Sequence, residues 1–260
     1  MVRRADISDR PPPSSIDLET PRIALVIAAH PDDAEFQCGG TLAKWARLGA
    51  AVHHLVLTDG SKGTWDRTAD VAALVARRRD EQVLAAGILG GGSVEFLDQT
   101  DGELCADIPT RDRVCEVIRR IQPDVVLGHD PWKRYRLHPD HAAAGRLCVE
   151  GIVAARDPWF APDQLRDGLT PHRPRALLLF EPDTADHAET FEESDLTLKI
   201  EALLAHRSQW ATTHLARSGP GTAVDPLERF REREVELAVG AGRWAGASLA
   251  EAYHLIDDEL

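Results

Sequence analysis

The chain of 260 residues lacks the hydrophobic runs of a membrane or secreted protein. No apolar stretch reaches the roughly 18 residues that a membrane-spanning helix needs, so we expect no membrane span. Residues 1–20 contain Arg3 and Arg4, but a proline- and serine-rich run at 11–15 follows instead of an apolar core. We therefore expect this segment to be a flexible leader and not a signal peptide.

Cysteine is scarce, and its spacing excludes two common structural roles. The four cysteines, Cys38, Cys105, Cys115 and Cys148, form no CxxC pair. That spacing is not typical of a zinc ribbon or of a disulfide framework. Free cysteines behave as small apolar residues that are usually buried. We expect four free thiols in a reducing compartment, and hence a cytoplasmic protein.

Positive charge is in deficit. Lys and Arg number 30 against 43 Asp and Glu, which gives a formal net charge of −13. Nucleic acid phosphates and anionic membranes both attract basic surfaces, so the balance argues against either as a general partner. A small-molecule substrate remains compatible with this charge.

The glycine motifs of nucleotide-binding folds are also missing. His-Pro-Asp-Asp follows the first apolar run, at the place where a dinucleotide-binding chain carries its glycine fingerprint. The three glycines at 90–92 precede no Lys-Ser or Lys-Thr, so they do not form a phosphate loop. Gly240, Gly242 and Gly246 follow a predicted helix and have the wrong spacing.

What is present is an alternation of short apolar runs with helical patterns. Hydrophobic residues make up 43% and charged residues 28%, which is ordinary for a globular protein. Strands alternating with helices predict a Rossmann-like, mostly parallel sheet with helices on both faces. The expected strands are 22–29, 52–58, 94–97, 124–128 and 175–180, and the expected helices are 41–48, 69–88, 110–121, 142–155, 196–210 and 226–239. The pattern at 252–256 fits either a closing strand or a helix end.

The chain shows no internal repeat and no sharp change in composition. We therefore expect a single domain over residues 21–260, behind the leader.

The most informative polar residues follow the first predicted strand. His30, Asp32 and Asp33 come directly after the apolar run 23–27, with Pro31 stiffening the turn between them. Open α/β sheets carry their ligands at the carboxyl ends of such strands. His30 and Asp33 would suit one divalent ion such as zinc, with Asp32 left as an uncoordinated base. Alternatively, Asp32 or Asp33 would simply cap the helix that follows.

A second cluster, His138-Pro139-Asp140-His141, precedes a predicted helix. Taken alone, His-x-x-His at a helix start is more often surface than metal site. Two His/Asp clusters at the carboxyl ends of one parallel sheet, however, favour a shared metal site.

These motifs resemble those of the LmbE-like or PIG-L family of zinc-dependent N-deacetylases. The DPW and HPDH loop looks closest to the diacetylchitobiose deacetylase branch, and Gln37 stands where the family more often has Gly. The matching stretches are AAHPDDAEFQCGGTLAKW at 28–45, TDGSKGTW at 58–65, RRDEQVLAAGILG at 78–90, TDGEL at 100–104, HDPWKRYRLHPDHAAAG at 129–145, KIEALLAHRSQ at 199–209 and AEAYHLI at 250–256.

The resemblance implies a role for each residue of the two clusters. Three residues would bind Zn2+, or Fe2+ in the same site: His30, Asp33 and His141. Asp32 would be the general base. His138 would polarise the amide or donate a proton, and Asp140 would orient His138.

Four further residues are expected at the substrate. By resemblance Arg78 and Asp101 would contact the sugar, and we add Trp132 and Tyr135 because they lie in the loop that leads to His138. The expected reaction is hydrolysis of an N-acetyl or other N-acyl group from an N-acetylglucosamine-type amino sugar or glycoconjugate. The alternatives are an amidase of the mycothiol-conjugate type and a catalytically silent sugar-binding module. Family resemblance also makes a homo-oligomer an expectation.

Overall fold

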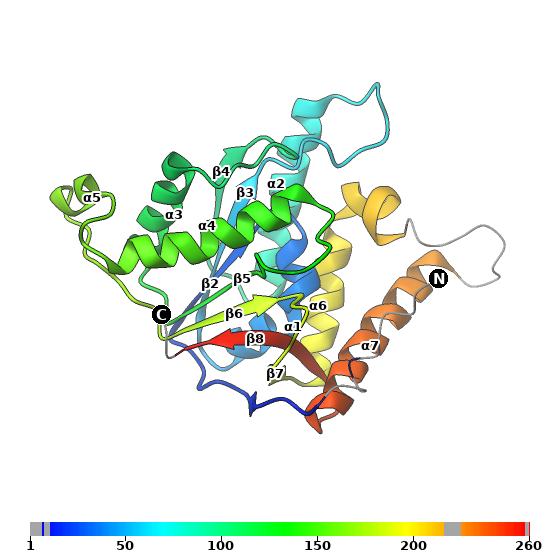
Figure 1. Cartoon of the computed structure of the whole chain (residues 1–260). Coiled ribbons are helices and arrows are strands. Elements are labelled where there is room, and N and C mark those ends of the chain that lie inside the picture. Colours follow the sequence, from blue (N-terminus) through cyan, green and yellow to red (C-terminus); the bar gives the residue numbers. More distant parts are fainter. Residues whose placement is uncertain (1–6, 8–10, 216–224, 258–259) are drawn as a thin grey trace.

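The structure, a computed structural model, describes residues 7, 11–215, 225–257 and 260. Eight strands of this part of the chain form one sheet in the order β1-β7-β8-β6-β5-β2-β3-β4 (Figure 1). Their bounds are β1 Ser15–Ile16, β2 Ile23–Ala28, β3 Ala51–Thr58, β4 Val94–Gln99, β5 Val125–His129, β6 Ala176–Phe180, β7 His187–Thr190 and β8 Ala250–Ile256.

The five strands β4, β3, β2, β5 and β6 are parallel to one another, and β8 pairs antiparallel with β6 and with β7. Strands β2, β5 and β6 are near-continuous apolar runs because helices cover both faces of the sheet. This arrangement confirms the predicted Rossmann-like, mostly parallel sheet.

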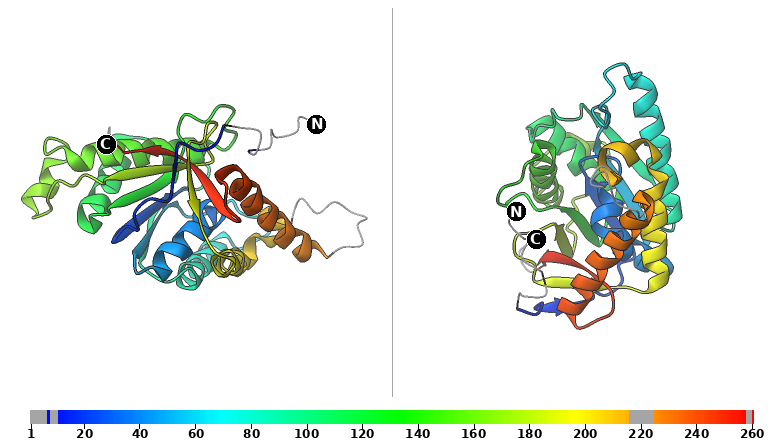
Figure 2. Two further views of the ribbon diagram at one scale, coloured as in Figure 1. Left: turned by 90° about the horizontal axis from the view of Figure 1, so that it is seen from below. Right: turned by 90° about the vertical axis from the view of Figure 1, so that its right-hand side faces the viewer.

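Helices α1, α2 and α6 lie on one face of the sheet, and α3 and α4 on the other (Figure 2). A short 3-10 turn at Arg207–Gln209 and a π turn at Trp210–His214 follow α6. The helix bounds are α1 Asp33–Arg47, α2 Val71–Ile88, α3 Ile108–Ile121, α4 Pro139–Arg156, α5 Pro162–Arg166, α6 Glu193–Ala205 and α7 Pro226–Ala245.

Strand β2 shows how the sheet divides the core. Leu25 and Ile27 pack with residues of α3 and α4, whereas Ala24 and Val26 pack with residues of α1 and α6. Side chains alternate between the faces of a strand, so one apolar run fills both layers. Because β2, β3 and β5 are parallel neighbours, the loops after them begin at the same edge of the sheet.

The predicted leader covers residues 1–20. Residues 1–6 and 8–10 lie outside the described residues, whereas residues 11–20 lie against the domain. Ser15 and Ile16 form β1, which pairs with β7, and Asp17 binds both Lys44 and Thr190. Residues 15–17 are therefore held in place by contacts with residues that are distant in the sequence.

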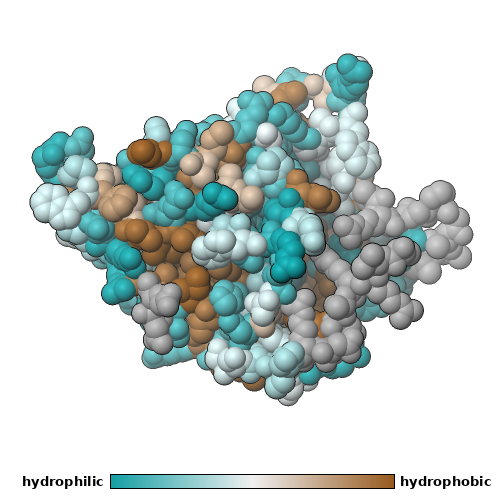
Figure 3. All heavy atoms as spheres, viewed as in Figure 1, coloured by the Kyte–Doolittle hydropathy of each residue, from teal (hydrophilic) through white to brown (hydrophobic). Residues whose placement is uncertain are grey.

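Other differences concern short elements. The predicted helix 196–210 ends at Ala205 and continues as the 3-10 and π turns, and residues 252–256 belong to strand β8. Strand β7 and helix α5 were not predicted. No described helix is long and apolar enough to span a bilayer. Hydrophobic side chains gather below α4, over β6 and β8, on the face that Figure 3 shows.

Candidate active site

The turn after β2 has an unusual backbone. The amide of Asp33 bonds the carbonyl of His30 at 3.4 Å and closes a β-turn of four residues. Asp32, the third residue of that turn, has φ 97° and ψ −21°. These angles are those of the third position of a type II turn, which usually requires glycine. Pro31 suits the second position of the same turn type.

The two adjacent aspartates point to different partners. Oδ2 of Asp33 accepts a hydrogen bond from the amide of His30 at 2.8 Å and lies 3.3 Å from Nδ1 of that residue. Oδ1 of Asp33 lies 3.3 Å from Nε2 of His141. Asp32 stands at the N-cap of α1 but its side chain makes no capping hydrogen bond. The capping alternative is therefore wrong for Asp32, and Asp33 faces the imidazoles.

The second cluster lies against the first. Helix α4 begins at Pro139 with His138 as its N-cap. The ring of His138 lies 4.5 Å from that of His30 and 4.9 Å from that of His141, measured between centroids. Residues three apart on a helix face the same side, which brings His138 and His141 together at the strand ends.

Asp140 has another partner than expected. Its Oδ2 bonds Nε2 of His30 at 3.1 Å and accepts from the amide of Gly102 at 2.6 Å, and Oδ1 accepts from the amide of Leu104 at 3.2 Å. The prediction that Asp140 orients His138 is not what this geometry shows. Residues two apart on a helix do not face each other, so Asp140 turns inward while His138 stays exposed.

Two further side chains complete the cluster. Oδ1 of Asp101 lies 3.2 Å from Nε2 of His30, so Asp101 lies inside the polar cluster. His129, to which no role was assigned, stacks on His141 at 4.4 Å, and its Nε2 lies 3.4 Å from Oδ2 of Asp33. The available signal for His129 was its position: it ends β5, the neighbour of β2 in the sheet.

The donor set fits a divalent cation. Among the described residues, three overlapping triples bring one ligand atom each within 4.8 Å of the others: His30–His138–His141, Asp33–His129–His141 and His30–Asp101–Asp140. The expected ligands His30, Asp33 and His141 are divided between these triples. Imidazole and carboxylate donors suit zinc or iron.

The pKa shifts of His30 and Asp33 also favour a bound cation. Burial opposes protonation of His30, but hydrogen bonds to Asp101, Asp140 and Asp33 outweigh it and hold its pKa well above the ordinary value. Burial also opposes ionisation of Asp33, yet the nearby imidazoles keep its pKa well below the ordinary value. Three carboxylates around one imidazole form a surplus of negative charge that a bound cation would balance.

Burial affects two other groups differently. It raises the pKa of Asp32 to about 6, against the opposing charge of Arg78. It lowers the pKa of His129 to about 4, so that ring is neutral at pH 7. At that pH His129 therefore adds no positive charge to the cluster.

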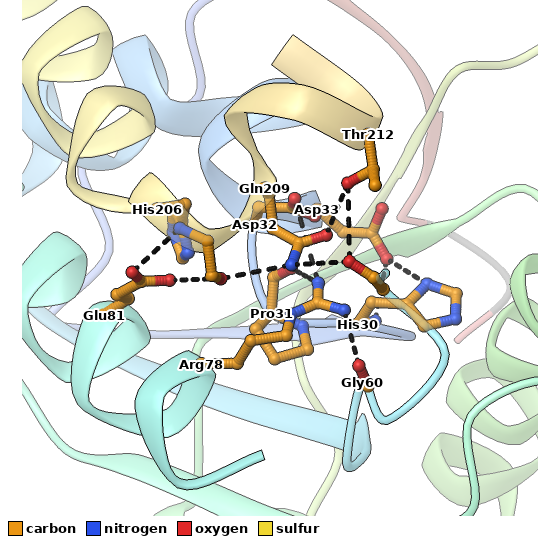
Figure 4. Close-up of polar contacts among 12 residues, drawn as sticks. His30, Pro31, Asp32, Asp33, Gly60, Arg78, Glu81, His206, Gln209 and Thr212 are labelled. Atoms are coloured by element: carbon orange, nitrogen blue, oxygen red, sulfur yellow. Dashed lines mark hydrogen bonds and ion pairs between the residues drawn. The ribbon is translucent and has the colours of Figure 1, made fainter. Parts of the chain in front are cut away.

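The expected substrate residues fall into two groups. Arg78 is only 3% exposed, and its guanidinium donates to the carbonyls of Pro31 at 2.7 Å and Gly60 at 2.9 Å (Figure 4). Nη2 of Arg78 also lies 3.9 Å from Oδ2 of Asp32, and a contact of Arg78 with the sugar stays a prediction. Trp132 and Tyr135 are 65% and 88% exposed on the loop before His138. Their role at the substrate stays a prediction.

A parallel sheet with a His/Asp cluster beyond β2 and β5 defines a class: Rossmann-like α/β proteins with a candidate metal site at the sheet edge. The sequence pattern of PIG-L, described as GlcNAc-PI de-N-acetylase, matches residues 25–152. The chain belongs to this family, as the resemblance of its motifs predicted.

Individual relatives agree with that assignment. The diacetylchitobiose deacetylase of Thermococcus kodakarensis is 36% identical over 186 residues, which are 72% of this chain and 69% of the relative. The 4-oxalmesaconate hydratase of Pseudomonas putida is 33% identical over 181 residues, 68% of this chain and 67% of the relative. The solved N,N'-diacetylchitobiose deacetylase of Pyrococcus horikoshii, in complex with its inhibitor MPG, has a TM-score of 0.80 and 28% identity. That likeness covers 91% of this chain and 84% of the other.

Proposed function

We propose that this protein is a metal-dependent hydrolase that removes an N-acetyl, or another N-acyl, group from an N-acetylglucosamine-type amino sugar or glycoconjugate. The observation that carries the proposal is the convergence of His30, Asp33 and His141, with Asp32 beside them and free of any capping bond. The deacetylase relatives support the amino-sugar substrate.

His30, Asp33 and His141 would hold the ion, zinc or alternatively iron. Such an ion supplies Lewis acidity and lowers the pKa of a water molecule to about 7. His129 and Asp101 flank these ligands and would fix their orientation, because outer partners of a ligand set its tautomer and ring angle.

The remaining side chains handle protons. Asp32 would accept the proton of the water that attacks the acyl carbon, as a general base. His138, exposed beside His30 and His141, would donate a hydrogen bond to the oxyanion that develops on the acyl oxygen. An amine leaves only when protonated, so the proton taken by Asp32 would return to the nitrogen as the C–N bond breaks. The products are a free amino sugar and a carboxylate.

Hydration of a carbon–carbon double bond is a second candidate, since one relative is a hydratase. The local charges favour the amino sugar over an unsaturated tricarboxylic acid. The two arginines against the cluster already bind protein oxygens: Arg78 binds Pro31 and Gly60, and Arg136 binds Glu181 and the carbonyl of Asp130. Asp32, Asp33 and Asp101 would repel a substrate with several carboxylates.

The test is a substrate panel. Metal-loaded protein is incubated with N-acetylglucosamine, diacetylchitobiose, longer N-acyl glucosamines and an oxalmesaconate-type acid, and free amine, released carboxylate and loss of the double bond are measured. We expect equal amounts of amine and carboxylate from at least one N-acylated sugar. Amine release only from a larger conjugate would favour the amidase alternative. Sugar binding without turnover would favour the silent module.

We also propose a cellular location and consider the oligomeric state. All four cysteines are free thiols, and Cys38, Cys115 and Cys148 are buried. Free thiols support the reducing, cytoplasmic compartment that we propose. A homo-oligomer stays a prediction, which size-exclusion chromatography with light scattering would test.

A further inference from the structure

We infer that Gln82, oriented by Glu35, positions the general base by holding the peptide group between Pro31 and Asp32. The inference rests on the proposed function for the role of Asp32. It concerns Glu35 of α1 and Gln82 of α2, which belong neither to the proposed metal ligands nor to the loop at residues 130–138.

Both polar atoms of one peptide group are held by side chains of the same helix. The carbonyl of Pro31 accepts from Nη2 of Arg78 at 2.7 Å. The amide of Asp32 donates to Oε1 of Gln82 at 3.0 Å. Arg78 and Gln82 are four residues apart on α2, so they lie on one face of that helix.

The orientation of this peptide group decides where Asp32 points. Type I and type II turns differ by a flip of the peptide between their second and third residues. Here that group joins Pro31 to Asp32, and Asp32 adopts φ 97°, a left-handed value that side chains rarely adopt. Flipping the group would reverse its carbonyl and amide and turn the Asp32 carboxylate away from its present direction. Surrounding bonds must therefore stabilise the observed form.

The side chain of Gln82 is itself oriented by a hydrogen bond to Glu35. Its Nε2 donates to Oε1 of Glu35 at 2.7 Å, which leaves Oε1 of Gln82 for the amide of Asp32. Oε2 of Glu35 lies 3.4 Å from Nε2 of His206. Glu35, Gln82 and His206 are fully buried, so water does not compete for these groups.

Arg78 has little room to move. A Cβ atom on Gly60 would meet Nη1 of Arg78 at 2.6 Å, and one on Gly63 would meet it at 2.4 Å. The amide and Oγ of Ser208 bind Glu81, at 3.0 and 2.6 Å, and fasten α2 to the turn after α6. The helix that holds the peptide group is thus itself fixed.

A reciprocal exchange tests the inference. Gln82→Glu removes the donor and sets two carboxylates against each other, whereas Gln82→Glu combined with Glu35→Gln restores one donor between the two positions. The measurements are kcat, KM, metal content and the hydrogen-exchange rate of the Asp32 amide by NMR. Gln82→Met lacks the second carboxylate and serves if Gln82→Glu does not fold. Arg77→Ala, an exposed change on the same helix, is the control.

We expect Gln82→Glu to lower kcat about tenfold to hundredfold, because a misplacement of about 1 Å can cost that much. KM and metal content should stay within twofold of the starting protein, and the Asp32 amide should exchange at least about tenfold faster. The double exchange should return kcat to within about threefold and restore the protection of the amide. Arg77→Ala should change none of these quantities.

Three results would overturn the inference. One is unchanged kcat and unchanged Asp32 protection in Gln82→Glu and Gln82→Met. Another is a loss of kcat that follows metal content or folded fraction, and the third is a double exchange no better than Gln82→Glu. Because amide exchange needs no turnover, it tests the inference even if no N-acyl sugar is cleaved. An inactive starting protein with a protected Asp32 amide would remove the proposed function alone.

Discussion

Two loops meet at the carboxyl edge of the sheet, and they differ in almost every respect. The turn at residues 30–33 is buried, and its backbone is held by side chains of α2. The loop at residues 130–138 is largely exposed, with Trp132, Tyr135 and Leu137 facing solvent. The two loops contribute to one site, since the rings of His30 and His138 are in contact.

The contrast suggests a division of labour. Bond-breaking chemistry needs groups fixed to within fractions of an ångström, and under the proposed function the buried turn would supply them. Selection among sugars needs a surface that can fit different shapes, and the exposed aromatic residues would provide one. Changes in the buried turn should therefore reduce kcat, whereas changes in the exposed loop should mainly alter KM.

The largest effect is expected at Asp32. Asp32→Asn removes the base without removing a proposed ligand, so kcat should fall by about 10²- to 10⁴-fold while metal content is kept. Initial rates of amine release and metal analysis check this. The neighbouring change Asp33→Asn is the matched control and should lose the metal. Full turnover in Asp32→Asn would remove the base assignment.

A smaller loss is expected at His138, the last residue of the exposed loop and the N-cap of α4. His138→Ala removes a proposed oxyanion donor, so kcat should fall by about 10²- to 10³-fold. Metal should stay bound, because His30, Asp33 and His141 are untouched. If His138→Ala loses its metal, His138 is a ligand, as its place in one of the three candidate triples would allow.

Changes in the exposed loop should alter KM rather than kcat. Trp132→Ala and Tyr135→Ala should each raise KM for the preferred sugar about three- to tenfold, since a stacked aromatic ring contributes on the order of 1 kcal/mol, and leave kcat within twofold. Trp159→Ala is the control, since Trp159 is 87% exposed and lies just beyond the other end of α4. Equal KM values in all three variants would show that Trp132 and Tyr135 do not contribute to sugar binding.

The smallest effect is expected at His206, whose protonation should make the stability of the fold depend on pH. Burial lowers the pKa of His206, but the hydrogen bond and charge of Glu35 and the charge of Asp32 outweigh burial and Arg78, so its pKa lies above 6.5. A raised pKa stabilises the fold below the unfolded value near 6.5, and that stability is lost as pH rises through the folded pKa.

Urea unfolding between pH 5.5 and 8.5 measures this contribution, with His206→Gln as the comparison. The stability advantage of the starting protein over His206→Gln should be largest at low pH and should shrink as pH rises. An advantage that is constant or grows with pH would contradict the assignment.

Much of the fold could be predicted because its strands are apolar runs bounded by polar residues. The runs that became β2, β5 and β6 identify buried parallel strands by composition alone. Strands β1 and β7 could not be found this way. Ser15–Ile16 has two residues, and His187–Thr190 is not an apolar run and pairs with β8 from far along the chain.

The site shows the same limit. His30, Asp33, His138 and His141 were predictable because each stands at a strand end or a helix start. The partners of Arg78 and Asp140 were not, because both side chains bind groups set by tertiary folding: the carbonyls of Pro31 and Gly60 for Arg78, and His30 for Asp140. Sequence spacing shows which face of a helix a side chain occupies but not what that face meets.

Anomalous diffraction at the zinc edge, from a crystal of this protein grown with zinc, would locate the bound ion. We expect one peak at bonding distance from His30, Asp33 and His141, with the carboxylate of Asp32 near it but not bonded. A peak held by His30, Asp101 and Asp140, or one bonded to Asp32, would show that the proposed ligand set is wrong.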